Sequence, residues 1–172
     1  SAFVMEFGSY EDVLRHLVDS SFVKEFGSYE EVLRHLGRRP VLCKLALITT
    51  IKEGVKKFRL TLDCRVSGSN DHATQSERIL LPGAWNTIHD VLAFSTKKQP
   101  GQRIKLMVCD FTDAFFMIPL GFSEQRYFVA SFRGRYYLWQ RAAQGSINGP
   151  NLFGRLSALV ARCTQGCFSQ DH

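Results

Sequence analysis

The 172-residue sequence predicts an α+β fold, in which hairpin-paired strands are mixed with helices that do not alternate regularly with them. Residues 58–66 (FRLTLDCRV) alternate between apolar and polar side chains, the period of two that is typical of a half-buried strand. Residues 126–132 and 135–139 are aromatic-rich strands joined at Arg133-Gly134, which is a hairpin signal. Residues 84–95 carry apolar side chains at helical spacing.

The composition is that of an ordinary globular protein, at 45% hydrophobic and 22% charged residues. Apolar stretches fall short of the ~20 residues that span a bilayer, and the N-terminus lacks a signal-peptide pattern. We therefore expect an intracellular protein of the cytoplasm or nucleus that is not secreted and has no membrane partner. The odd number of cysteines, five, favours reduced, buried thiols over a disulfide framework.

The N-terminal segment contains a duplication, because residues 3–17 recur as residues 22–36 with two differences. Each copy has the i, i+3, i+4, i+7 spacing of an amphipathic helix. Ser9 and Ser28 are each followed three residues later by an acid, which is the capping-box pattern of a helix start. Gly37 fits the end of the second helix.

We interpret residues 1–37 as a duplicated helical appendage and residues 38–172 as the body of the protein. Near-identity of the copies indicates a recent tandem duplication, with a structural or incidental role for its helices. We do not expect both copies to pack equally well on the body.

The body begins with two strands and a loop. Residues 41–51 (VLCKLALITTI) are apolar and β-branched, and with residues 58–66 they predict a hairpin with a basic tip. Residues 67–78 form a polar loop, and the helix over residues 84–95 is expected to bury Trp85 and Leu92.

A central strand and a helix complete the predicted body. Residues 104–111 (IKLMVCDF) are apolar enough for a central strand, in which Asp110 stands near the carboxyl end. Pro150 suits the first turn of a helix, where its missing N–H does no harm. Cys163 and Cys167 lie four apart on this helix and are expected to be buried thiols, since no second pair completes a zinc site.

Positive charge is concentrated in residues 38–65, which hold eight bases and two acids, whereas residues 1–37 hold three bases and seven acids. Clustered lysines and arginines neutralise phosphates, so this segment is either a solvated surface or a groove for a polyanion.

Four blocks in order resemble the reverse transcriptase family of retroelements, over residues 38 to about 168. The first is FRLTLDCR at residues 58–65, with Asn70 after it. The others are VCDFTDAFFMIPL (108–120), YFVASFRGRYY (127–137) and Gln144-Gly145-Ser146 with Pro150 and Phe153. The resemblance implies a partial right-hand polymerase, with fingers at about 38–83 and 124–145 and palm at about 84–123 and 146–172.

The resemblance also implies roles for particular residues. Asp110 would be the catalytic carboxylate that holds Mg²⁺, assisted by the backbone carbonyl of Phe111, and the complete family domain uses two such ions. Arg59, Asp113, Phe115, Gln144 and Gly145 would bind the incoming dNTP, with Phe115 as the steric gate against a ribose 2′-hydroxyl.

Basic side chains would complete the site. Lys52, Lys56 or Lys57 would reach the terminal phosphate, and the sequence leaves the choice among them open. Arg65, Lys56 and Lys57 would contact the RNA or DNA template-primer. The chemistry agrees, because nucleotidyl transfer needs carboxylates for two Mg²⁺ ions and cations over the triphosphate.

The sequence departs from the family in one respect that matters for activity. The later hairpin that carries two adjacent aspartates is absent from these 172 residues, as are the rest of the palm and the thumb of the parent polyprotein. We therefore interpret the chain as a fragment of an RNA-directed DNA polymerase that is inactive alone. The alternative is a degenerate, non-catalytic nucleic-acid-binding module, or a relic, acting if at all through residues 38–65.

Overall fold

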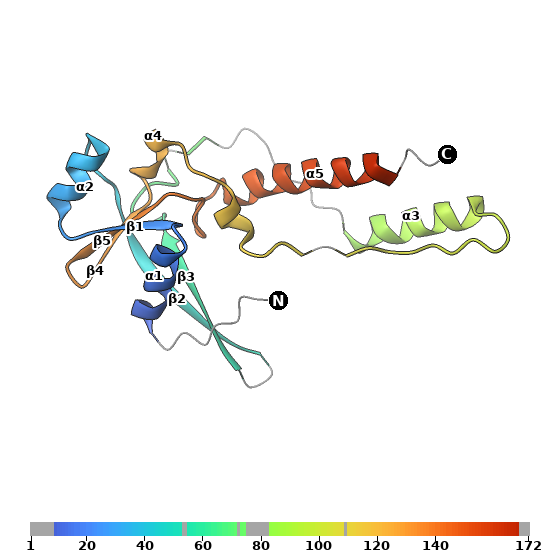
Figure 1. Cartoon of the computed structure of the whole chain (residues 1–172), viewed down its shortest axis with the longest axis horizontal. Coiled ribbons are helices and arrows are strands. Elements are labelled where there is room, and N and C mark those ends of the chain that lie inside the picture. The colour runs from blue at the N-terminus through green and yellow to red at the C-terminus, as the bar shows by residue number, and fades with distance from the viewer. Residues whose placement is uncertain (1–8, 53–54, 72, 75–82, 109, 169–172) are drawn as a thin grey trace.

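The computed structural model describes residues 9–52, 55–71, 73–74, 83–108 and 110–168, although the side chains of residues 52 and 55–57 are not described (Figure 1). Its centre is a five-stranded sheet in the order β1-β5-β4-β2-β3. The strands are β1 (Val23–Phe26), β2 (Leu42–Lys52), β3 (Val55–Asp63), β4 (Val129–Phe132) and β5 (Arg135–Trp139). Neighbouring strands are antiparallel except β2 and β4, which pair in parallel.

The predicted hairpins are confirmed. Strands β2 and β3 pair from Lys44 opposite Asp63 to Lys52 opposite Val55. Strands β4 and β5 turn at Arg133 and Gly134, both of which have a positive φ, as a tight two-residue connection requires.

The helices are α1 (Tyr10–Asp19), α2 (Tyr29–Leu36), α3 (Ala84–Lys97), α4 (Phe122–Gln125) and α5 (Gly149–Phe168), with a 3₁₀ turn, η1 (Ala114–Met117). The predicted caps are confirmed, because the Ser9 and Ser28 hydroxyls accept hydrogen bonds from the N–H groups of Asp12 and Glu31. Gly37 ends α2 in the left-handed conformation.

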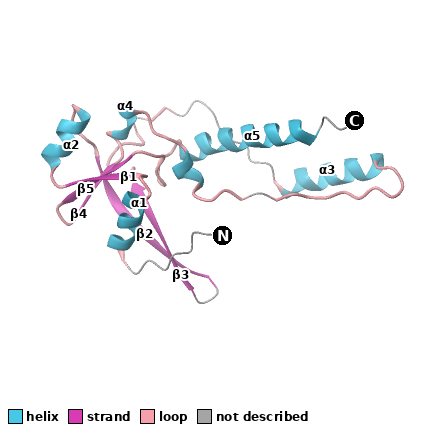
Figure 2. Cartoon of the chain, viewed as in Figure 1, coloured by secondary structure: helices cyan, strands magenta, loops and turns pink. Residues whose placement is uncertain are grey.

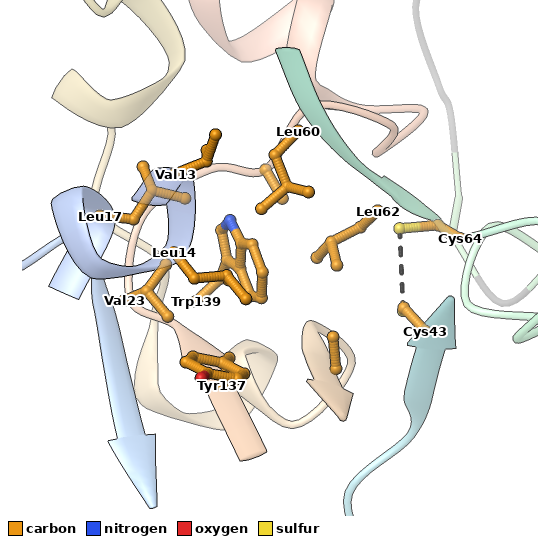
Figure 3. Packing of buried hydrophobic residues seen from close by; sticks show 12 residues of the cluster. Val13, Leu14, Leu17, Val23, Cys43, Leu60, Leu62, Cys64, Tyr137 and Trp139 are labelled. Atoms are coloured by element: carbon orange, nitrogen blue, oxygen red, sulfur yellow. Dashed lines mark hydrogen bonds between the residues drawn. The ribbon is translucent and has the colours of Figure 1, made fainter. Parts of the chain in front are cut away.

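The two copies of the duplicated segment cover opposite faces of the sheet. Val13, Leu14 and Leu17 of α1 pack in a core with Tyr137 and Trp139 of β5 (Figure 3). Val32 and Leu36 of α2 pack with Leu138 and Val129, which point to the other face because side chains alternate along a strand.

The segment between these helices joins the sheet, since β1 pairs with β5 from Val23 opposite Trp139 to Phe26 opposite Tyr136. Residues 9–37, which the sequence suggested were an appendage, thus contribute the edge strand and cover both faces.

The central strand predicted over residues 104–111 is wrong for the described residues of that segment. Residues 104–108 have no regular secondary structure, and Val108 is 92% exposed. No described strand lies beside this segment, so its backbone lacks a ladder partner and its side chains lack a covering layer. An apolar run cannot become a buried strand without such neighbours.

The helix over residues 84–95 forms as α3, but its expected burial is wrong, because Trp85 is 75% exposed. Helices α3 and α5 extend away from the sheet (Figure 2), and α5 leaves Cys163 and Cys167 exposed, contrary to expectation. Both helices follow from local periodicity, whereas burial depends on a second layer.

Candidate nucleotide pocket

Strand β3 positions the first group of predicted site residues. Arg59 is exposed and stands opposite Ile48 in the β2–β3 ladder. Lys52, Lys56 and Lys57 occupy the end of the same hairpin, as the register shows, while their side chains lie outside the described residues.

Arg65 follows the strand and is also exposed. Its guanidinium lies 3.6 Å from the Asp63 carboxylate. Hydrogen bonds from the backbone N–H groups of Val66 and Arg65, together with the Arg65 charge, lower the pKa of Asp63, and partial desolvation opposes the shift.

The turn at Gln144 and Gly145 is pressed against β3. The Leu62 N–H donates a hydrogen bond of 2.9 Å to the Gln144 carbonyl. Gly145 has a φ of +109°, and a Cβ atom there would lie 1.9 Å from the Leu62 carbonyl oxygen. Only glycine allows this approach, so the turn packs directly against the strand.

Asn70 ties the loop after β3 to the same turn. Its side-chain amide donates to the Gly145 carbonyl at 3.2 Å, and its side-chain carbonyl accepts from the Ile147 N–H at 3.1 Å. Both polar ends of the side chain are therefore used to hold the turn that precedes α5.

Helix α5 fixes the position of Phe115. A Cβ atom on Gly149 would lie 2.8 Å from the Phe115 ring, so the missing side chain makes room for the ring. The Phe153 ring lies 6.1 Å from the Phe115 ring and 5.5 Å from the Phe111 ring, centroid to centroid. Aromatic packing thereby holds residues 111–115 against the start of α5.

These segments surround a cavity of about 620 Å³. Of the predicted site residues, it brings together Arg59, Asp113, Phe115, Gln144 and Gly145, with Phe111 beside them. The Gln144 side-chain oxygen is buried and has no hydrogen-bond partner among the described residues. Because solvent does not reach this oxygen, it is an unpaired polar atom of the packed turn and not part of the surface that the cavity offers to a ligand.

Asp110 does not line this cavity. It precedes Phe111 directly, but its side chain is exposed at the surface of the segment that lacks strand partners. The cavity therefore collects the predicted nucleotide contacts without the predicted catalytic carboxylate.

Helix α1 forms a wall of the cavity that sequence reasoning missed. Val13, His16 and Leu17 line it from one face of the helix. The amphipathic spacing predicted that the apolar face of α1 would be buried. It did not indicate which element of the fold would cover that face. Burial raises the pKa of Asp113, and the nearby His16 acts in the opposite direction.

A second cavity, of about 450 Å³, lies at the loop after β3 and the start of α5. Its lining includes the polar side chains of Ser69, Asn70, Asn148, Asn151 and Arg155. Ser146 lines both cavities, so the turn held by Asn70 separates them.

The described residues do not fit the two Mg²⁺ ions that the resemblance implies. Among them, no group of three or more His, Cys, Asp or Glu side chains could hold a metal ion. Asp110 is exposed and Asp113 is half-buried on the cavity wall, which leaves no carboxylate cluster of the kind that clamps two ions.

Comparison with known proteins supports the fold. The chain is similar to a solved foamy viral protease-reverse transcriptase in complex with double-stranded DNA, with a TM-score of 0.51 and 18% identity over 84% of this chain. The match spans 21% of that protein's chain. The mixed α+β fold is thus consistent with part of a polymerase-like fold.

Two other comparisons find nothing. No protein-family model matches the sequence, and no curated protein matches it. Within the described parts of the chain, none of the helices has the length and apolar character needed to cross a membrane.

Proposed function

We propose that the 620 Å³ cavity binds a deoxynucleoside triphosphate, as the nucleotide-binding part of a reverse-transcriptase-like fragment. The observation that carries the proposal is the meeting of three distant segments: β3, residues 111–116 and the Gln144–Gly145 turn. The cavity volume falls in the range typical of small-molecule sites, about 300–1,000 Å³.

Each segment supplies one kind of contact. The Arg59 guanidinium provides a permanent positive charge for phosphate oxygens. The Gln144–Gly145 turn, pressed against β3, supplies a wall of fixed shape. The Phe115 ring, held by Gly149 and Phe153, forms a rigid apolar surface for the sugar.

We assign binding, not synthesis, to this chain alone. Asp110 is exposed and does not line the cavity that would hold the nucleotide. Synthesis needs a cluster of carboxylates that clamps two ions, and the described residues supply no such cluster around Asp110.

Calorimetric titration with dATP tests the nucleotide site. The Arg59→Ala variant is expected to bind dATP about tenfold or more weakly, because hydrogen bonds to charged groups contribute roughly 1.5–3 kcal/mol. The Arg34→Ala variant is the matched control, since it removes the same charge from α2 on the other face of the sheet. Equal dATP affinity in the wild type and Arg59→Ala would contradict the proposal.

A second candidate function is nucleic-acid binding through the basic segment 38–65. It is favoured by the composition of this segment, which holds eight bases and only two acids. Anisotropy of a labelled RNA–DNA hybrid, measured over a range of KCl concentrations, tests it. Replacing both Lys56 and Lys57 with alanine is expected to weaken binding and to reduce the slope of log K against log[salt] by about 2.

The control for this experiment is the double replacement of Lys97 and Lys98, which removes two charges at the exposed end of α3. A salt slope that is the same for the Lys56/Lys57 variant as for the wild type would exclude the hairpin as a nucleic-acid surface.

A further inference from the structure

Two buried cysteines lie next to each other where β2 begins and β3 ends. The Cys43 and Cys64 sulfur atoms are 4.0 Å apart, and both thiols are buried in the main core (Figure 3). Neither residue lines the candidate nucleotide pocket. The pair thus requires an explanation that is independent of the proposed nucleotide binding.

The end of the β2–β3 ladder brings the two cysteines together. The last pair is Lys44 opposite Asp63, and Cys43 and Cys64 are the next residue on each side of it. The Leu62 N–H points away from β2 and bonds to Gln144 instead, which makes Leu45–Leu62 a non-hydrogen-bonded pair. Cys43 and Cys64 each lie two residues from this pair, so they continue the same face of their chains.

This geometry suits a cross-strand disulfide. The sulfur atoms are 4.0 Å apart, and the spacing of neighbouring strands, about 4.7–4.9 Å, falls within the Cα range of about 4.4–6.8 Å for cystines. Forming the disulfide closes the sulfur separation from 4.0 Å to the bond length of about 2.05 Å.

Polar groups surround the Cys43 sulfur. It lies 3.2 Å from the Ser67 hydroxyl and 3.8 Å from the Ser69 hydroxyl, and its thiol donates to the Tyr127 carbonyl at 3.2 Å. The hydrogen bond shared with Cys64, followed in size by those with Ser67 and Ser69, lowers the pKa of Cys43, although burial opposes the shift. The same contact, followed by burial, raises the pKa of Cys64, so Cys43 is the more acidic thiol.

We propose that Cys43 and Cys64 form a reversible intramolecular disulfide when the folded protein meets a hydroperoxide. The Cys43 sulfur attacks the peroxide O–O bond, which gives a sulfenic acid and releases water from hydrogen peroxide. The Cys64 sulfur then displaces hydroxide from the sulfenic acid, and the Cys64 proton leaves with it as water. In total, two thiols are oxidised, one peroxide is reduced and two water molecules form.

The disulfide would act on the loop after β3. This loop carries Ser69, which contacts the Cys43 sulfur, and Asn70, which holds the Gln144–Gly145 turn. Linking Cys64 to β2 anchors the start of the loop covalently. Oxidation is therefore expected to restrict the wall shared by the two cavities.

Peptide mapping of the full chain tests the proposal. The folded protein is treated with hydrogen peroxide, denatured in N-ethylmaleimide and digested with trypsin. We expect residues 39–44 (RPVLCK) to be recovered linked to residues 60–65 (LTLDCR), at a mass two hydrogens below their sum. Dithiothreitol should restore both free peptides.

Two comparisons make the result decisive. A variant with Cys109, Cys163 and Cys167 replaced by serine should still yield the linked pair, which excludes exchange from other thiols. The same treatment in urea should give mixed pairings, because only the fold holds Cys43 beside Cys64. Recovery of both peptides labelled with maleimide after oxidation of the folded chain, or of Cys43 as a sulfinic acid beside free Cys64, would overturn the proposal.

Discussion

Replacing Gly145 with alanine is expected to destabilise the protein by about 2–5 kcal/mol, because strain and overlap act at the same atom. The residue has a φ of +109°, and its new methyl group would lie 1.9 Å from the Leu62 carbonyl oxygen. That oxygen belongs to a strand backbone, which cannot rotate away as a flexible side chain does. The turn must move, which breaks the bonds from Leu62 and Asn70.

The decrease in the free energy of unfolding is measured by urea denaturation, with circular dichroism as the signal. Two glycine variants separate its causes. Gly37→Ala has a φ of +66° without any neighbour within 4 Å, so it reports backbone strain alone. Gly166→Ala lies in helix α5, where nothing is within 4 Å of the added Cβ, and is expected to be neutral or slightly stabilising. A Gly145→Ala cost no larger than that of Gly37→Ala would mean that the turn does not contact β3.

Replacing Leu14 with alanine is expected to cost about 2–5 kcal/mol, the range for removing a large side chain from a packed core. Leu14 is 1% exposed beneath α1 and packs in the cluster that contains Trp139. If α1 covers the sheet as described, the cavity left by this change has rigid walls and cannot collapse easily.

The duplication provides a control within the same chain. Leu33 occupies the equivalent position of the second copy, in the identical local sequence VLRHL, but it is only half-buried. Leu33→Ala should therefore cost clearly less than Leu14→Ala in the same urea experiment. Equal costs, or a larger cost at Leu33, would show that the first copy does not pack on the sheet.

Several elements were predictable because their signals are local. A serine hydroxyl accepts from an N–H three residues away, and Gly37 adopts a conformation that other residues disfavour, so both helix starts and the end of α2 followed from short stretches of sequence. The hairpins followed from alternation and from the glycine turn at Gly134.

The failures share a different cause. Residues 104–108 are apolar, and α3 has an apolar stripe, but neither property specifies what will cover it. An apolar side chain is buried only when another part of the protein covers it. Among the described residues, no element covers residues 104–108 or the apolar stripe of α3. The expectation of buried thiols at Cys163 and Cys167 was wrong for the same reason.

The candidate site was predictable in part. The motif resemblance pointed to Arg59, Asp113, Phe115 and Gln144, and the fold brings these residues to one cavity. Their assigned roles remain proposals. The resemblance pointed to Asp110 as well, but this residue lies outside the cavity wall, and His16 of α1 lies in that wall without any motif to indicate it.

The sequence alone determined two nearly identical capped helices and two hairpins. It also determined the concentration of basic residues between positions 38 and 65. Tertiary structure decided that one helix covers the face of the sheet that bears the 620 Å³ cavity and its copy the opposite face. Two segments with the same periodicity carry the same local information, so only the surfaces that the sheet offers on each side can distinguish them.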